Sequence, residues 1–146
     1  MVNRDRIISI FKERRIKLTP QRLAIIDFLS KEHGHYSAED IYTTLKEKFP
    51  YMSFSTVYNT LKTLSDLHLI EELYLLDKKV VFDTNTSPHF HFLCTKCGKI
   101  FDINSSECLN VEKCNTAFSG ALIERVHVYM YGICKDCLRK EKERSN

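Results

Sequence analysis

The sequence lacks any apolar run that approaches the ~20 residues of a membrane span, and its N-terminus is too charged for a signal peptide. We therefore expect a cytoplasmic protein with no membrane-spanning segment, in a compartment where thiols stay reduced and can bind metals. At 146 residues the chain has room for one ordinary domain or two small ones. Small domains bury little surface, so a small C-terminal unit would gain stability from a bound metal.

Two Cys-x-x-Cys pairs, Cys94/Cys97 and Cys134/Cys137, lie in the last third of the chain. Zinc is held by thiolates at about 2.3 Å, and a two-residue spacer lets both sulfurs of a tight turn point at one ion. The two pairs therefore predict one structural zinc site. A redox dithiol is the alternative, but it needs only one such pair, usually at the start of a helix that follows a strand. Two further cysteines lack this spacing and are assigned no role: Cys108 and Cys114.

The net formal charge is only +3, but basic residues are concentrated near the N-terminus. Only Asp5 and Glu13 oppose them in this opening segment. The basic residues are Arg4, Arg6, Lys12, Arg14, Arg15, Lys17 and Arg22. Such a stripe suggests a polyanionic partner, although charged residues on a solvated helix would give the same pattern.

Apolar spacing predicts two helices in the first third of the chain. The first contains Ile7, Ile8 and Phe11. The second begins at Thr19-Pro20, where threonine suits the N-cap and proline the first helical position. Its inner face is expected to carry Leu23, Ile26 and Leu29.

Two more helices are predicted before residue 70. One begins at Ser37, with Asp40 as a capping-box partner, and ends at Pro50. The next is capped by Ser53 or Ser55. Its apolar positions are Val57, Leu61 and Leu64, which places Tyr58, Asn59 and Lys62 on the outer face.

Two strand-like runs follow these helices, from Leu69 to Leu75 and from Val80 to Phe82, joined by a turn that contains Asp77-Lys78-Lys79. Helices followed by a hairpin describe a winged helix, whose last helix would enter the major groove of DNA. The same elements also occur in many domains that do not bind DNA.

A strictly alternating segment begins at His89, after the polar stretch 84–88 that we interpret as an interdomain hinge. Strand side chains change face at every step, so His89 and His91 share one face. Asp83 and Asp102 lie nearby in the sequence. Imidazoles mixed with carboxylates suit Fe(II), Mn(II) or Zn(II), which predicts a second metal site that differs from the all-sulfur one. A solvent-facing histidine pair is the simpler alternative.

Taken together, these features resemble the ferric uptake regulator family of bacterial metalloregulators across nearly the whole chain. The matching stretches are Leu18-Thr19-Pro20-Gln21-Arg22, His35-Tyr36-Ser37-Ala38-Glu39-Asp40-Ile41-Tyr42, Ser55-Thr56-Val57-Tyr58, His89-Phe90-His91 and both Cys-x-x-Cys pairs.

The resemblance implies an α+β protein with an N-terminal winged-helix DNA-binding domain, residues 1–83, a hinge at 84–88, and a C-terminal α/β dimerisation domain, residues 89–146. It implies a homodimer that represses transcription at an inverted-repeat operator in double-stranded DNA when a divalent metal is bound. It also implies a structural zinc held by the four cysteines and a regulatory Fe(II) or Mn(II). The regulatory ligands it nominates are His35, Asp83, His89, His91 and Asp102.

Within the family, the sequence is most similar to the peroxide-sensing branch. Asp102 and Asn59 are typical of that branch, whereas iron-uptake members usually carry glutamate and arginine there. The branch implies that iron-catalysed oxidation of a ligand histidine, His35 or His89, releases the repressor from DNA. The residues nominated for DNA contact are Arg15, Lys17, Arg22, Ser55, Thr56, Tyr58, Asn59 and Lys62. No role is assigned to His33, and His127 is interpreted as structural.

Three other functions fit parts of the sequence. One is an iron-uptake or other metal-responsive repressor of the same family that ignores peroxide. A second is an enzyme, either a thiol oxidoreductase or a metal hydrolase, but the sequence shows no strand-then-helix context for a redox dithiol and no clear general base beside the metal ligands. The third is a zinc-ribbon module that binds protein or RNA. We expect a regulator and not an enzyme.

Overall fold

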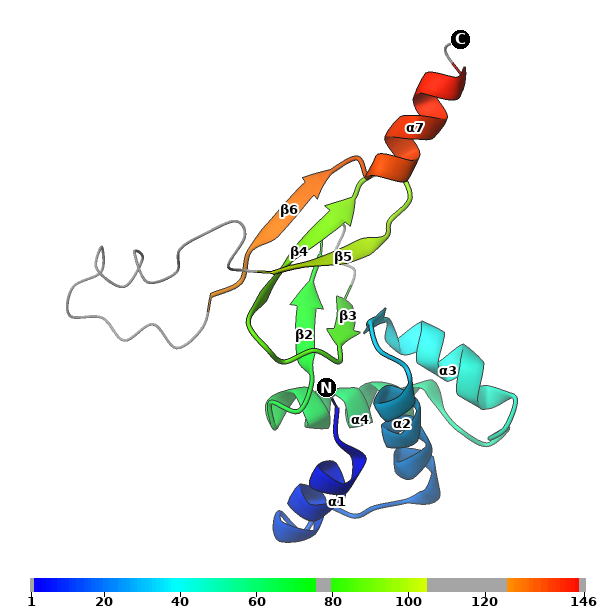
Figure 1. Ribbon diagram of the computed structural model, residues 1–146. Coiled ribbons are helices and arrows are strands. Elements are labelled where there is room, and N and C mark those ends of the chain that lie inside the picture. The colour runs from blue at the N-terminus through cyan, green and yellow to red at the C-terminus, as the bar shows by residue number, and fades with distance from the viewer. Residues whose placement is uncertain (1, 76–79, 105–125, 145–146) are drawn as a thin grey trace, which may run out of the picture. The chain divides into compact units, whose positions relative to one another are not determined.

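The computed structural model of the protein describes residues 2–75, 80–104 and 126–144. The chain divides into two compact units, Met1–Thr86 and Ser87–Asn146 (Figure 1). In the part of the chain described, no helix combines the length and apolar character needed to cross a membrane. Three features considered above lie outside the described residues: Cys108, Cys114 and the turn Asp77-Lys78-Lys79.

Four helices in the first unit begin at side chains that cap them. These helices are α1 (Arg4–Glu13), α2 (Pro20–Lys31), α3 (Ala38–Lys46) and α4 (Phe54–Asp66). The predicted caps Thr19 and Ser37 are confirmed, since each side-chain oxygen accepts a hydrogen bond from a first-turn N–H. Ser37 also forms the full capping box with Asp40. Of the two candidates for α4, Ser53 is the cap, and it accepts from the Thr56 N–H at 3.1 Å.

Two details of these helices differ from the sequence-based prediction. Helix α3 ends at Lys46, one turn before Pro50, because Leu45 O accepts from both the Lys48 and Phe49 N–H groups and closes the helix in a turn. In α2, Ile25 is fully buried, whereas Leu23 is only half-buried. Ile25 and Ile26 therefore share the inner face, which is wider than the predicted stripe.

The core of the first unit lies where the inner faces of these helices meet. Phe11 and Leu29 are fully buried in it, and Phe82 lies against the same cluster from a strand. The predicted inner face of α4 is confirmed, because Val57, Leu61 and Leu64 have no exposed surface. This packing fixes which face of α4 remains outside.

A three-stranded antiparallel sheet completes the first unit, in the order β1-β3-β2. Its strands are β1 (His35–Tyr36), β2 (Glu71–Tyr74) and β3 (Val80–Asp83). The two-residue strand β1 was not predicted. It pairs His35 with Asp83 and Tyr36 with Phe82, and so joins the start of α3 to β3. Helices with an appended small sheet form the expected winged-helix arrangement.

The second unit contains a three-stranded sheet in the order β5-β4-β6, followed by a helix. Its elements are β4 (His89–Cys94), β5 (Ile100–Asn104), β6 (Tyr129–Gly132) and α7 (Lys135–Arg144). The central strand β4 pairs antiparallel with β5 and parallel with β6. Helices and small sheets in both units confirm the α+β class.

Candidate metal centres and nucleic-acid interface

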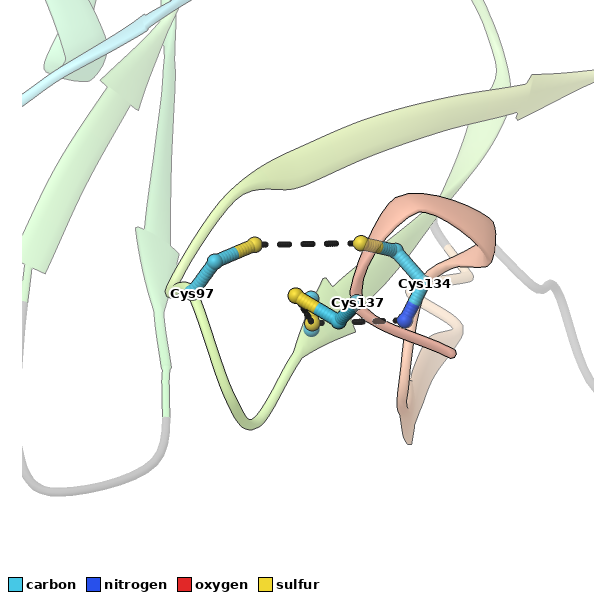
Figure 2. A group of neighbouring side chains, drawn as sticks. Cys97, Cys134 and Cys137 are labelled. Atoms are coloured by element: carbon cyan, nitrogen blue, oxygen red, sulfur yellow. Dashed lines mark hydrogen bonds between the residues drawn. The ribbon is translucent and has the colours of Figure 1, made fainter. Parts of the chain in front are cut away.

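The four paired cysteines meet at one point in the second unit. Cys94 ends β4, Cys97 follows in the turn toward β5, and Cys134 and Cys137 lie at the start of α7. Their sulfur atoms all lie within 4.8 Å of one another. Figure 2 shows Cys97, Cys134 and Cys137 with their sulfurs turned toward a common centre.

The spacing of these sulfurs fits a tetrahedral zinc ion. Four thiolates at about 2.3 Å from one zinc ion would have sulfur–sulfur separations of about 3.8 Å. The observed separations are 3.9 Å for Cys94 and Cys137 and 3.8 Å for Cys97 and Cys134. Gly98 has φ of 69° in the first turn, a conformation that glycine adopts without strain, and its N–H bonds to Cys94 O at 2.9 Å.

The protonation of the cluster also suits a cation. The Cys134 backbone N–H donates to the Cys94 sulfur at 3.3 Å, and such bonds lower the pKa of Cys94 to about 6. The pKa of Cys137 is raised, first because its side chain hydrogen-bonds with Cys134 and then because of burial. The Cys94 thiolate is therefore stabilised by its surroundings, whereas Cys137 holds its proton, and a bound cation would favour the ionised form of Cys137.

Two of the nominated regulatory ligands meet in the first unit. The pairing of β1 with β3 places His35 opposite Asp83, and His35 Nε2 lies 3.6 Å from Asp83 Oδ2. Gly34 holds this end of the sheet through two hydrogen bonds with Thr84. The other carboxylate oxygen of Asp83 accepts from the Asn85 N–H at 2.8 Å. One imidazole and one carboxylate are thus fixed side by side.

The other three nominated ligands meet on one face of the sheet in the second unit. His91 lies directly opposite Asp102 across β4 and β5. His89 Nε2 lies 3.5 Å from Asp102 Oδ1, and the His89 and His91 ring centroids are 4.4 Å apart. One ligand atom from each of the three lies within 4.8 Å of the others. This mixed set of imidazoles and a carboxylate fits Fe(II), Mn(II) or Zn(II).

A backbone contact sets the orientation of one of these imidazoles. His89 Nδ1 lies 2.7 Å from Ser87 O, and a carbonyl can only accept, so Nδ1 carries the hydrogen. In the tautomer with this hydrogen bond, Nε2, which faces Asp102, is the ring nitrogen whose lone pair can bind a metal. Such a bond from the distal ring nitrogen is the usual support of a ligating histidine. The sequence could not indicate this contact.

Helix α4 presents a polar and aromatic surface opposite its buried stripe. Tyr58 is 38% exposed and Asn59 is exposed. The Tyr58 ring lies 6.4 Å from both Phe54 and Phe82, so the side chain is held from α4 and from β3. This surface has the features of a recognition helix.

The basic residues nominated for DNA contact differ in their surroundings. Arg15 and Lys17 are exposed after α1, and Arg15 has φ of 55°. Arg22 donates from Nη1 to Lys17 O at 2.8 Å and so fixes the segment that connects α1 to α2. The Lys62 ammonium lies 2.7 Å from Glu72 Oε2 on β2. The hydroxyls of Ser55 and Thr56 both contact the Ser53 cap.

Two histidines that are not among the nominated ligands have separate positions, His33 and His127. His33 accepts a hydrogen bond at its carbonyl from the Tyr36 hydroxyl, which stabilises the approach to β1. His127 precedes β6, and its ring is stacked with that of Tyr129. Sequence reasoning did not single out Tyr129 or Glu72, because neither belongs to a motif and both acquire neighbours only through strand pairing.

Comparison with known proteins identifies the family of this chain. A model of the ferric uptake regulator family matches residues 13–131. The chain belongs to the ferric uptake regulator family. The resemblance found in the sequence is thereby confirmed. The family member named peroxide operon regulator in Bacillus subtilis (strain 168) is 37% identical over 134 residues, which covers 92% of each chain.

Solved structures of family members have the same fold. The Campylobacter jejuni peroxide stress regulator has a TM-score of 0.68 at 31% identity and covers 89% of this chain and 98% of its own. The Helicobacter pylori ferric uptake regulator has a TM-score of 0.78 at 24% identity, with 92% of this chain and 90% of its own covered. The second similarity supports the fold alone.

Proposed function

We propose that this protein is a metal-dependent transcriptional repressor that senses peroxide through oxidation of a ligand histidine. The observation that carries the proposal is the set of His89, His91 and Asp102 on one sheet face, next to a separate four-cysteine centre. The B. subtilis relative, named for a peroxide operon, supports the peroxide-sensing branch.

The four cysteines would hold a structural zinc ion. Sulfur ligation connects the end of β4 to the start of α7, and the four sulfurs come together only in the folded chain. Metal-binding free energy then becomes folding free energy for this small sheet. We infer that zinc supports residues 89–146 as the dimerisation domain, and that the protein acts as a homodimer.

The regulatory site would combine the two groups of nitrogen and oxygen ligands. His35 and Asp83 belong to the first unit, and His89, His91 and Asp102 to the second. We propose that all five bind one Fe(II) or Mn(II) ion and so join the DNA-binding domain to the dimerisation domain across the hinge at 84–88. A ligand that binds only the joined arrangement shifts the protein toward it.

The joined dimer would present two α4 helices to successive half-sites of an inverted repeat in double-stranded DNA. Tyr58 and Asn59 are proposed to contact base edges, with Ser55 and Thr56 at the helix start nearby. Phosphate contacts are proposed for Arg15, Lys17, Arg22 and Lys62. Affinity would then depend strongly on salt through these charges.

Peroxide would end repression by changing one ligand. A bound Fe(II) supplies the electrons that activate peroxide, which Mn(II) does not do readily. In the net reaction, hydrogen peroxide and the ring of His35 or His89 give an imidazole that is one oxygen heavier and one water molecule. The altered ring binds metal poorly, so the two domains separate and the DNA is released. The protein changes itself once and does not turn over a substrate, so we propose no enzymatic function.

Operator binding tests this function directly. Binding is measured with Fe(II) and with Mn(II), before and after peroxide, and the masses of peptides with His35 and His89 are determined. We expect the Fe(II) form alone to lose DNA and gain one oxygen on a histidine. Metal-dependent binding that ignores peroxide in both forms would identify a metal-responsive repressor of the iron-uptake kind instead.

A further inference from the structure

A tyrosine lies beside the histidine ligands of the second unit. Strand β6 runs parallel to β4 in a register that pairs Tyr129 with His91. The two rings are stacked, with centroids 5.8 Å apart and planes inclined by 21°. His91 is in turn 4.4 Å from the His89 ring, between centroids. Tyr129 is therefore adjacent to the ligand face without belonging to the ligand set.

A further ring extends this row on the other side of Tyr129. The His127 ring is parallel to that of Tyr129 within 4°, at a centroid distance of 6.3 Å. His127 is exposed, whereas His91 is 3% exposed. Stacked rings thus lead from the buried ligand His91 to the surface, with the phenol between two imidazoles. Offset stacking of this kind is an attractive arrangement for aromatic rings.

Tyr129 carries the most easily oxidised ring of this row. A phenol loses an electron and a proton more easily than an imidazole does, because its radical is delocalised over the ring and oxygen. We propose that Tyr129 is a redox-active residue that intercepts part of the oxidising equivalents generated at His89, His91 and Asp102. This inference rests on the proposed function, because it requires iron and peroxide to react at that face.

Oxidation of Tyr129 would be a one-electron step that cellular thiols reverse. One-electron reduction of hydrogen peroxide by Fe(II) gives Fe(III), hydroxide and one hydroxyl-radical equivalent. Abstraction of the phenolic hydrogen atom of Tyr129 by that equivalent gives water and a tyrosyl radical. A cellular thiol returns a hydrogen atom to the tyrosyl oxygen, and a second thiol reduces Fe(III) to Fe(II) while its proton neutralises the hydroxide. The two thiyl radicals combine as a disulfide, so two thiols and one hydrogen peroxide give one disulfide and two water molecules. Tyr129 is regenerated, and that equivalent is not available to oxidise a ligand histidine.

Interception would set the sensitivity of the regulator. Each peroxide molecule then either marks a histidine irreversibly or is consumed through Tyr129 without loss of repression. Tyr129 is itself only partly buried, so a small thiol can approach the phenol. A tyrosine in this position therefore raises the peroxide dose needed for derepression.

The test compares Tyr129→Phe with the wild-type protein. Phenylalanine keeps the stacked ring but has no phenolic hydrogen. The Fe(II) proteins receive equal peroxide, and the one-oxygen mass gain at His35 and His89 is measured together with electron paramagnetic resonance of rapidly frozen samples. We expect Tyr129→Phe to raise the histidine oxidation yield by about twofold or more and to abolish a tyrosyl radical signal present in the wild type.

Tyr131→Phe is the matched control. Tyr131 lies on the same strand but pairs with Leu93 and not with an imidazole. Equal oxidation yields in wild type and Tyr129→Phe, with no radical signal lost, would overturn the inference, as would an equal rise in Tyr131→Phe. A radical signal that depends on Tyr129 would support it even if no histidine gained oxygen, and that result would count against the proposed function alone.

Discussion

Lys62 on α4 and Glu72 on β2 form an ion pair in which Lys62 Nζ lies 2.7 Å from Glu72 Oε2. The hydrogen bond to Glu72 holds the pKa of Lys62 above its usual value, so the ammonium is charged at neutral pH. A lysine ammonium has three N–H donors. Lys62 can therefore contact a phosphate while it is still paired with Glu72, or it can break the pair to make that contact. The pair connects α4, the proposed recognition helix, to the wing, formed by β2 and β3.

We predict that Glu72→Gln strengthens operator binding at low salt. Removing the carboxylate charge frees the Lys62 ammonium for phosphate, and each added phosphate contact steepens the plot of log affinity against log salt by about 0.9. Operator titrations across a salt series measure this slope. Asp66→Asn is the control, because Asp66 is 71% exposed and lies 4.0 Å from the same ammonium. Weaker binding with an unchanged slope would show that the pair only aligns the wing.

A second pair of variants should distinguish base contacts from phosphate contacts. We predict that Asn59→Ala costs about 1 to 3 kcal/mol at the operator and relaxes the preference at one base position. Lys17→Ala should weaken binding to all sequences alike and flatten the salt dependence, since Lys17 is exposed outside α4. Competition between operator variants distinguishes the two effects. If Asn59→Ala kept the full operator preference, its proposed base contact would be wrong.

We predict that Cys94→Ser loses zinc and the dimer together. Its sulfur lies 3.9 Å from that of Cys137 and also accepts the Cys134 N–H, so one change disrupts both halves of the cluster. Metal analysis and sedimentation report the two losses. Gly98→Ala is a graded comparison, because a side chain there costs about 1 to 2 kcal/mol of backbone strain but meets no atom within 4 Å. A zinc-free dimer that still bound operator DNA would contradict the structural role.

Asp102→Glu should alter sensing more than repression. The longer carboxylate moves its oxygen outward by one methylene, which changes where peroxide can bind but leaves a metal ligand in place. We predict metal-dependent operator binding with a much weaker peroxide response. His35→Ala and His89→Ala should instead lose tight regulatory metal binding outright. Peptide masses provide the decisive measurement, and oxidation confined to cysteines would indicate a thiol-based sensor.

Local signals explain why the helices could be predicted from sequence. Thr19-Pro20 and the Ser37/Asp40 pair specify helix starts within a few residues, and the inner face of α4 follows from spacing alone. Strand β1 was missed because two residues carry no periodicity, and it exists only through its pairing with β3. The same limit applies to β6, whose parallel partner β4 lies far back in the chain.

The metal centres were predictable to different degrees. Cysteine spacing indicates a zinc site without any knowledge of the fold, because the ligand geometry is built into each turn. The alternation of His89 and His91 indicates a shared face, but which carboxylate joins them depends on register. His91 lies opposite Asp102 only because β5 returns antiparallel. The Lys62–Glu72 pair and the stacking of Tyr129 depend on strand pairing in the same way, and no sequence motif predicts either of them.

Strand β4 carries ligands of both centres, with His89 and His91 in its first half and Cys94 at its end. Its parallel neighbour β6 leads directly to Cys134, 40 residues after Cys94. A growing polypeptide therefore cannot close the sulfur centre until Cys137 has left the ribosome, and β6 cannot pair with β4 until Gly132 has done so. During synthesis the winged helix is complete long before this. New copies of the protein consequently pass through a stage in which the winged helix can fold but the sulfur centre cannot form, and only after that stage can one zinc ion bind all four cysteines.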